Sequence, residues 1–406
     1  MKTKIKKPEL LAPAGDWSML NSAINAGANA VYLGVEKLNM RAMADNFSIN
    51  ELNEIVSHCK NKNVKVHLTL NTIVFENELE DLDRIIRQAK YAGVDMIICW
   101  DFSVINKCKE YSIPFCISTQ ASISNSGSAK FFENLGAKRI VLARECTLDK
   151  IREIREKTKL EIETFVHGAM CIAVSGRCFM SHEIFNKSAN RGECIQPCRR
   201  EYEIIDKDES YSLILGDDYV MSPKDLCTIE FIDKLIESGI DSFKIEGRKR
   251  SPEYILKVVA AYRKAIDLYF ENKLTDDIKA ELVDELSKVY NRGFSPGFYL
   301  GVPGSESYAK IYGSKATTRK IYIGKVLNYY RKNKIAYVSI DAGTLINGDS
   351  IYIIGNTTGT VELNINKMVL DNKEIESASK GSKVTFECSE RVREFDKVYK
   401  IIEAEN

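Results

Sequence analysis

One local pattern recurs through the first 250 residues and constrains the fold more than any other feature. A helical pattern ends, a glycine follows and a short apolar run begins, around Gly27, Gly93, Gly136 and Gly239. Glycine adopts the left-handed conformation that ends a helix at little cost. An apolar run without alternation is typical of a strand that is buried on both faces. The pattern therefore predicts helices that alternate with the strands of a parallel sheet.

The remainder of this region completes a regular alternation. The sequence predicts eight strands, at residues 10–13, 30–34, 65–71, 96–101, 114–119, 139–143, 160–166 and 242–246. Amphipathic helical patterns, such as those at residues 76–94 and 147–159, separate most of them. This order indicates an α/β fold of the (β/α)8-barrel type. A doubly wound open sheet is the alternative, but the glycine-rich motifs of its nucleotide-binding members are absent from the sequence.

The pattern changes after about residue 316. Short strands then follow one another without helices, separated by turn residues such as Asn347 and Gly348. Evenly spaced short strands predict a small closed β-barrel. A helical stretch that starts at residue 251 leads toward it. We expect a catalytic barrel over residues 1–275, a linker over 276–315 and an all-β barrel over 316–406.

Composition narrows the class of protein. The net charge of +1 excludes a globally basic nucleic-acid binder, but it does not exclude a local basic patch. No apolar run follows the N-terminal lysines, and no stretch is long and apolar enough to span a membrane. We therefore expect a cytoplasmic protein. Thiols stay reduced there, and eleven cysteines is an odd number, so clustered cysteines indicate metal binding or chemistry.

Four cysteines are concentrated in 28 residues after the seventh predicted strand: Cys171, Cys178, Cys194 and Cys198. Their spacing, C-x6-C-x15-C-x3-C, lacks the C-x2-C turns of structural zinc sites. Iron–sulfur clusters accept more varied spacings, so the pattern favours a 4Fe–4S cluster over zinc. The plain alternative, small buried apolar residues, fits poorly with the glycine and polar neighbours. Cys227 is a possible substitute for Cys198, but it fits better as a packed residue at the start of a helix.

The cysteines belong to an insertion predicted over residues 167–222. Because active sites of such barrels lie at the carboxyl ends of the strands, this insertion is expected at the catalytic end. His167 directly follows the seventh predicted strand and could exchange a proton near neutral pH. A structural imidazole is the equally simple reading of the same residue.

Several segments together resemble a known family. The segments "ELLAPAGD", "STQAS", "VLARE", "SGRC", "SFKIEGR" and "NRGF" occur in order across nearly the whole chain. They are similar to the collagenase-like peptidase family U-32, and within it to the prephenate-dependent tRNA uridine hydroxylases. The C-terminal part also resembles the second β-barrel of translation elongation factors, at "INGDSIYIIG".

The resemblance implies an activity and a cofactor. It implies oxygen-independent conversion of the wobble uridine of tRNA to 5-hydroxyuridine, with prephenate as hydroxyl donor. It also implies that the four clustered cysteines ligate a 4Fe–4S cluster, and that a second family member or a second copy could be a partner. Gln120 and Arg144, at the ends of two predicted strands, would then hold a carboxylate of prephenate. Glu246 and Arg248 end the eighth strand and could instead pair with each other.

A basic stretch without acidic residues covers residues 319–334. The candidates for contact with the anticodon region of tRNA are Arg319, Lys320, Tyr329, Arg331 and Lys332. Basic groups bind phosphates, and aromatic rings stack on unpaired bases. A solvated edge strand, protected from aggregation by its lysines, is the alternative.

Two further functions remain open at this stage. A peptidase is implied by the family name, but the sequence has no H-E-x-x-H motif. Only His167 with Cys171 could form a nucleophile–base pair. The other possibility is a non-catalytic iron–sulfur scaffold that works with a family partner.

Overall fold

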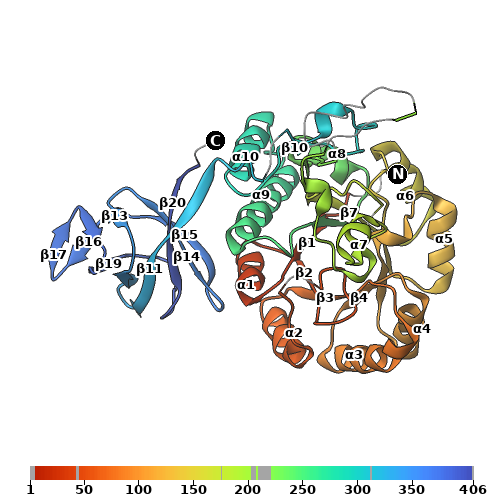
Figure 1. Ribbon diagram of the computed structural model, residues 1–406, viewed down its shortest axis with the longest axis horizontal. Coiled ribbons are helices and arrows are strands. Elements are labelled where there is room, and N and C mark those ends of the chain that lie inside the picture. Colours follow the sequence, from red (N-terminus) through yellow and green to blue (C-terminus); the bar gives the residue numbers. More distant parts are fainter. Residues whose placement is uncertain are drawn as a thin grey trace.

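The protein consists of two units that lie side by side, a barrel surrounded by helices and a smaller all-β unit (Figure 1). The structure is a computed structural model. It describes residues 5–42, 45–174, 176–202, 207–208, 221–310 and 313–404. Part of the predicted insertion, over 203–206 and 209–220, lies outside the described residues.

Eight parallel strands form the barrel. In order they are β1 (Glu9–Pro13), β2 (Ala30–Leu33), β3 (Lys65–Leu70), β4 (Met96–Cys99), β5 (Phe115–Ile117), β6 (Arg139–Val141), β7 (Glu161–Gly168) and β9 (Ser242–Ile245). Strand β9 pairs with both β7 and β1, so the ring closes. The (β/α)8-type barrel and all eight predicted strands are confirmed.

Helices cover the outside of the barrel (Figure 1). They are α1 (Trp17–Asn25), α2 (Leu52–Lys60), α3 (Leu79–Ala92), α4 (Phe102–Glu110), α5 (Ser126–Leu135), α6 (Leu148–Lys157), α8 (Ile232–Glu237) and α9 (Pro252–Phe270), with α10 (Asp276–Ser287) packed on α9. Gly93 and Gly136 end α3 and α5 with φ of 77° and 97°. The glycine pattern in the sequence therefore marks real helix ends.

The insertion adds small elements that the sequence did not predict. Helix α7 (Met180–Phe185) lies in front of the barrel in the view of Figure 1. Strand β8 (Asp225–Cys227) pairs antiparallel with the end of β7 and parallel with β10 (Phe294–Ser295). Strands of three and two residues are too short to produce a recognisable hydrophobic period.

The C-terminal unit is antiparallel and all-β, as predicted. Its strands are β11 (Thr318–Tyr330), β12 (Ile335–Ile340), β13 (Thr344–Ile346), β14 (Ser350–Gly355), β15 (Gly359–Asn364), β16 (Met368–Leu370), β17 (Lys373–Ile375), β18 (Ser377–Ser379), β19 (Lys383–Glu387) and β20 (Lys397–Glu403). Eight of them form one sheet, in which β15 and β17 are the outer strands, and β13 pairs with β18. Within the described residues, hydrogen bonds do not join those outer strands into a closed ring.

The two units contact each other through α1, α9 and β15. Ser22 Oγ donates to Thr360 Oγ1 at 3.0 Å, and Lys257 pairs with Glu362 at 2.7 Å. Gly359, with φ of 74°, allows this close approach, because a Cβ there would lie 2.7 Å from the backbone nitrogen of Ser22. The helical stretch after residue 251 is part of the barrel wall, since α9 packs against α1 and β1.

Candidate functional site

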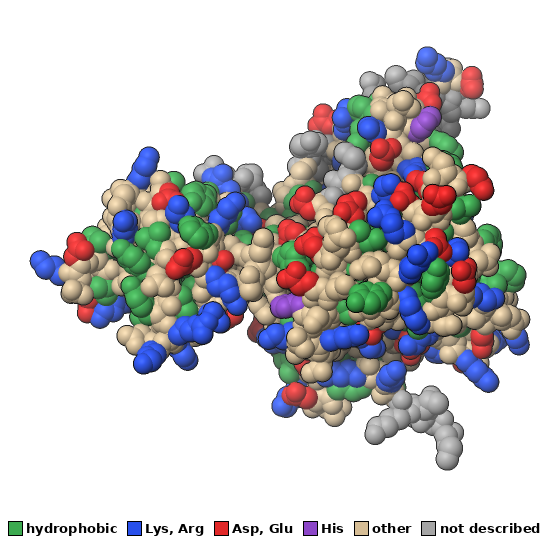
Figure 2. All heavy atoms as spheres, turned by 90° about the horizontal axis from the view of Figure 1, so that it is seen from below, with side chains coloured by type: hydrophobic (Ala, Val, Ile, Leu, Met, Phe, Trp, Pro, Cys, Tyr) green, Lys and Arg blue, Asp and Glu red, His purple; other side chains and the backbone are tan. Residues whose placement is uncertain are grey.

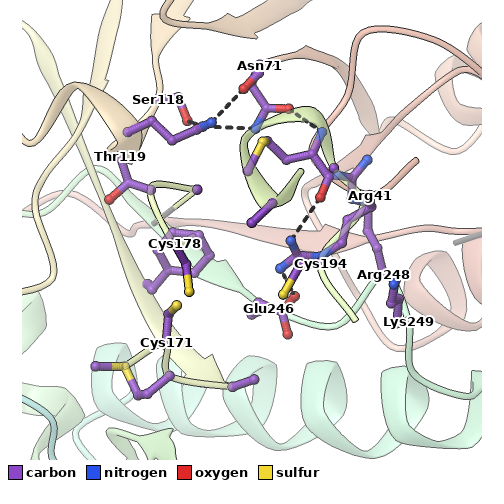
Figure 3. Close-up of a pocket in the computed structure, with 18 of the residues that line it drawn as sticks. Arg41, Asn71, Ser118, Thr119, Cys171, Cys178, Cys194, Glu246, Arg248 and Lys249 are labelled. Atoms are coloured by element: carbon purple, nitrogen blue, oxygen red, sulfur yellow. Dashed lines mark hydrogen bonds and ion pairs between the residues drawn. The ribbon is translucent and has the colours of Figure 1, made fainter. Parts of the chain in front are cut away.

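A cavity of about 160 Å³ opens at the carboxyl ends of the barrel strands, where barrel active sites lie. Its lining combines residues of β2, β3, β6, β7 and β9 and of the loops that follow the strands with residues of the insertion. Figure 3 shows the two groups of side chains facing each other. The insertion therefore lies at the catalytic end of the barrel, as the sequence predicts.

The four clustered cysteines all line this cavity. In Figure 3 the thiols of Cys171 and Cys178 point toward each other. The backbone N–H of Gln196 donates to Cys194 Sγ at 3.4 Å. Burial raises the pKa of the Cys198 thiol, Arg199 lowers it, and the other three thiols raise it further. All four thiols therefore lie close enough to interact electrostatically.

The spacing of these thiols does not form a compact site for a single ion. Within the described part of the chain, no three His, Cys, Asp or Glu side chains are grouped closely enough to hold one metal ion. Cys227 lies elsewhere: it is buried at the end of β8, and its Sγ is 4.0 Å from Tyr262 Oη. It ends a strand instead of starting a helix, and it does not line the cavity.

Two arginines flank the cysteines. Arg144 donates from Nη1 to the Ala169 carbonyl at 2.9 Å, and its guanidinium lies 4.2 Å from the ring centre of Phe165. Arg199 donates from Nη1 to the Pro223 carbonyl at 2.8 Å. Burial lowers the pKa of both guanidinium groups, and the thiols raise it. Both Nε atoms are buried without a partner among the described residues, so each arginine retains a donor.

The opposite wall of the cavity holds a second group of charges. Arg41 Nη2 pairs with Glu246 Oε1 at 2.8 Å. Burial raises the pKa of Glu246, but Arg41 and Arg250 outweigh it and lower that pKa to about 2. Arg248 instead donates from Nη1 to Thr69 Oγ1 at 3.0 Å. The expected pairing of Glu246 with Arg248 is therefore wrong, because Arg41 takes that position.

Gln120 is held rigidly at the cavity wall. It lies in a 3-10 turn, Thr119–Ala121, and its Nε2 donates to the Asn71 carbonyl at 2.6 Å. Its Oε1 accepts from Ser118 Oγ at 2.6 Å and from Asn71 Nδ2 at 3.2 Å. One N–H of the amide is left for a ligand.

The floor of the cavity carries a buried ion network. Lys244 Nζ lies 2.9 Å from Glu163, and Arg139 pairs with the same carboxylate at 3.0 Å. Lys244 also lies 4.6 Å from the ring centre of Tyr32. Lys244 also lines the cavity, so its ammonium group places a cation at the cavity floor.

His167 does not line the cavity. Strand alternation would place it inside the barrel with Phe165, but a β-bulge between these residues pairs it with Ile245. It is 2 % exposed, and its Nδ1 faces Tyr262 Oη at 3.5 Å. The expected position of His167 beside the cluster is thus wrong, and the structural reading of this imidazole fits better.

Acid should destabilise the fold through His167. Burial and then Arg250 lower the pKa of its imidazole from 6.5 to about 3. As pH falls through this interval, the unfolded state binds a proton before the folded state does, so the free energy of unfolding decreases. We expect His167→Phe to remove this pH dependence of the free energy of unfolding, which amounts to at most about 1.4 kcal/mol per pH unit. Urea titrations between pH 6.5 and 4 would measure it. Parallel pH profiles for the two proteins would contradict this.

The basic stretch does not form one patch. Lys320 pairs with Glu253 of α9 at 2.7 Å, and Tyr329 Oη donates to the Cys388 carbonyl at 3.0 Å, so both are engaged within the protein. Arg331 and Lys332 are exposed in the turn after β11, about 40 Å along the strand from Arg319. Since β11 pairs with β12 and β20, the edge-strand interpretation is wrong. On the face shown in Figure 2, basic and acidic side chains are interspersed.

Comparison with known proteins identifies the family. The model of "Peptidase family U32" matches residues 15–309, most of the barrel unit. The chain belongs to peptidase family U32. An "Uncharacterized protease" of Methanocaldococcus jannaschii is 42% identical over 96% of this chain and 97% of its own length. A "Collagenase" of Porphyromonas gingivalis is 39% identical over 97% of each chain. "tRNA hydroxylation protein P1" of Bacillus subtilis is 39% identical over 88% of this chain and 86% of its own length.

The cavity of this U32 family member lacks a nucleophile–histidine pair among its described lining residues. Cys171 is exposed there, but no histidine is among the described residues that line it. Sequence reasoning missed Arg41, Asn71 and Lys244, which line the same cavity. In addition, no helix in the described ranges has the length and apolar character needed to cross a membrane.

Proposed function

We propose that this protein hydroxylates the wobble uridine of tRNA to 5-hydroxyuridine without molecular oxygen, with prephenate as hydroxyl donor. One observation carries the proposal: four thiols and several buried cations share one cavity in a chain 39% identical to a tRNA hydroxylation protein. Cationic side chains suit an anionic co-substrate and an RNA, whereas a peptide bond offers them no charge to bind.

We further propose that Cys171, Cys178, Cys194 and Cys198 hold a 4Fe–4S cluster. The fit is supported by the four thiols in one cavity and by the N–H that donates to Cys194 Sγ. Arg144 and Arg199 add positive charge beside the anionic thiolates. A group of four irons spreads its ligands more widely than zinc does, which suits the absence of a compact ion site among the described residues. Such a cluster, when bound, can transfer electrons.

The other cavity residues would bind and orient the substrates. Prephenate is a dicarboxylate, and Arg144 with its free Nε suits one carboxylate, while Gln120 can donate its remaining N–H to the same group. Arg248 is fixed by Thr69 at the opposite wall and suits the second carboxylate. Lys244 at the floor can hold negative charge that develops on the uracil ring.

The decisive test is the nucleoside content of total tRNA. We expect 5-hydroxyuridine and its derivatives to disappear from a deletion strain, as measured by mass spectrometry. The wild-type gene should restore them, and Cys178→Ala should not. Purified protein should form 5-hydroxyuridine on tRNA from that strain when prephenate is added. Failure of the purified protein alone, with success after addition of a second family member, would support the scaffold role instead.

The peptidase remains the second candidate, because relatives carry the names "Collagenase" and "Uncharacterized protease". It can be tested on the same preparation by cleavage of collagen peptides. Activity that survives Cys171→Ala would have to come from a group other than that thiol, whereas activity of iron-free protein that Cys171→Ala abolishes would support a cysteine peptidase.

Outside the cavity, we propose that Arg331 and Lys332 contact the tRNA backbone away from the target base. Both are exposed at the end of the β11–β12 hairpin. Replacing both with glutamate should weaken tRNA binding and make the log–log salt dependence shallower by roughly two units, one per lost phosphate contact. Lys380→Glu, in an exposed turn between β18 and β19, is the matched control. An unchanged slope would contradict the contact.

A further inference from the structure

A second hollow adjoins the cavity on the other side of Cys194 and Glu246. Both hollows are lined by Arg41, Ala169, Cys194, Gln196, Glu246 and Lys249, so these residues form a common wall. The outer hollow alone adds Ile195, Arg250, Tyr290 and Arg292. We call this outer hollow the vestibule. A group bound in it would lie next to a second group bound in the cavity.

The vestibule carries an excess of positive charge. Four cations line it: Arg41, Lys249, Arg250 and Arg292. Only two carboxylates oppose them in the described residues, Glu246 in the wall and the buried Asp225 behind it. Four positive and two negative charges leave a surplus of two. An anion is the ligand that such a surplus favours.

The two arginines are held in fixed positions. Arg292 Nη1 lies 3.2 Å from Asp225 Oδ1, and Arg250 Nη2 lies 3.9 Å from the other carboxylate oxygen. Both guanidinium groups also lie over the ring of Tyr290, at 3.8 Å for Arg250 and 5.3 Å for Arg292. Because one carboxylate cannot use all their donors, N–H groups remain for a ligand. The site is therefore organised before an anion arrives.

Lys249 differs from the three arginines because it has no carboxylate partner among the described residues. It lies at the wall between the two hollows, is exposed, and has no hydrogen bond or ion pair with another described side chain. In Figure 3 it lies beside Arg248, on the same side of the cavity as Glu246.

The position in the fold suits a phosphate. Barrel enzymes frequently bind phosphate groups at the loops after the last strands, near a helix N-terminus. Here the loop that follows β9 supplies Lys249 and Arg250, and α9 begins at Pro252 directly after it. Arginine forks match the paired oxygens of a phosphodiester.

We propose that the vestibule binds a phosphodiester of the RNA substrate, one that flanks the nucleotide whose base enters the cavity. The identity of the anion as RNA rests on the proposed function, whereas the anion site itself rests on the geometry. The shared wall then separates base from backbone: the base lies among the cysteines and Lys244, and the phosphate lies against Lys249, Arg250 and Arg292.

The test combines one protein change with one RNA change. The RNA is a fluorescent anticodon stem-loop, made with normal phosphates or with one uncharged methylphosphonate, on either the 5′ or the 3′ side of the wobble uridine. We expect one of the two methylphosphonates and Lys249→Ala each to weaken binding about ten- to a hundredfold, as expected for one charge-assisted contact. The two changes together should cost little more than either alone. Lys157→Ala, an exposed lysine at the end of α6, should leave the affinity unchanged.

A small probe separates this inference from the proposed function. Inorganic pyrophosphate is titrated by calorimetry, with malonate as the dicarboxylate counterpart. Pyrophosphate binding that Lys249→Ala weakens, without any binding of the stem-loop, supports the anion site and overturns its assignment to RNA. If the stem-loop binds and neither of the methylphosphonates nor Lys249→Ala weakens its binding, the vestibule is not a phosphate site. The proposed function is unaffected by that result. A third outcome is that malonate binds instead of pyrophosphate and that Lys249→Ala weakens the binding of malonate. The vestibule would then bind a carboxylate, and the phosphodiester assignment would be wrong.

Discussion

Replacement of Cys178 by alanine is expected to abolish the brown colour of the anaerobically purified protein. The wild type should contain roughly four iron and four sulfide per chain, with a broad absorbance that bleaches on reduction. The same loss is expected for alanine at the other three cavity cysteines. All four line one cavity, so each should be required for a four-thiolate site.

The matched control is a cysteine that lies near the cavity but not in it. Cys227→Ala should retain the full iron and sulfide content, because its thiol is buried beside Tyr262, at 4.0 Å from the hydroxyl. Cys59→Ala and Cys388→Ala, in the two hydrophobic cores, should also retain the cluster. One zinc per chain without sulfide, or loss of iron in Cys227→Ala with retention in Cys198→Ala, would contradict the assigned ligands.

The barrel could be predicted because its signals are local. The glycines that end helices and the apolar runs after them each occupy about ten residues, and they determine the helix end and the strand by backbone preference and burial alone. The clustering of four cysteines is local in the same sense, since they come from one insertion. The C-terminal strands also show in the sequence, but their order does not, because pairing joins segments as distant as β11 and β20.

The rest of the site could not be predicted because it depends on contacts between distant segments. Arg41 reaches Glu246 across 205 residues of sequence, and no periodic pattern marks it. His167 was misplaced by a single bulge, which reverses the alternation of a strand without changing its composition. The basic stretch does not form one patch for a related reason: Lys320 pairs with Glu253 of the barrel unit.

Removal of the carboxylate of Glu163 is expected to cause a large loss of stability. Its side chain is fully buried and pairs with Lys244 at 2.9 Å and Arg139 at 3.0 Å. Arg139 keeps Glu9 and Glu161 as partners, but Lys244 has no second carboxylate among its described contacts. Breaking a buried pair leaves an uncompensated charge, so Glu163→Ala should lower the free energy of unfolding by about 3–5 kcal/mol.

Urea unfolding at several pH values can separate this ion network from simple loss of packing. Burial raises the pKa of Glu163, but Lys244 and Arg139 outweigh it and lower that pKa. The carboxylate therefore contributes stability above the unfolded pKa of about 4.3, and this contribution is lost as pH falls through the lower folded pKa. The free energy of unfolding of Glu163→Gln should therefore fall less steeply at acidic pH than that of the wild type.

The control is Lys65→Ala, which breaks the exposed pair with Glu9. It should lower the free energy of unfolding by only about 0–1 kcal/mol. If Lys65→Ala and Glu163→Gln lower the free energy of unfolding equally at pH 7, burial does not strengthen the ion network of Glu163. Lys244 would then not be held at the cavity floor by this ion pair.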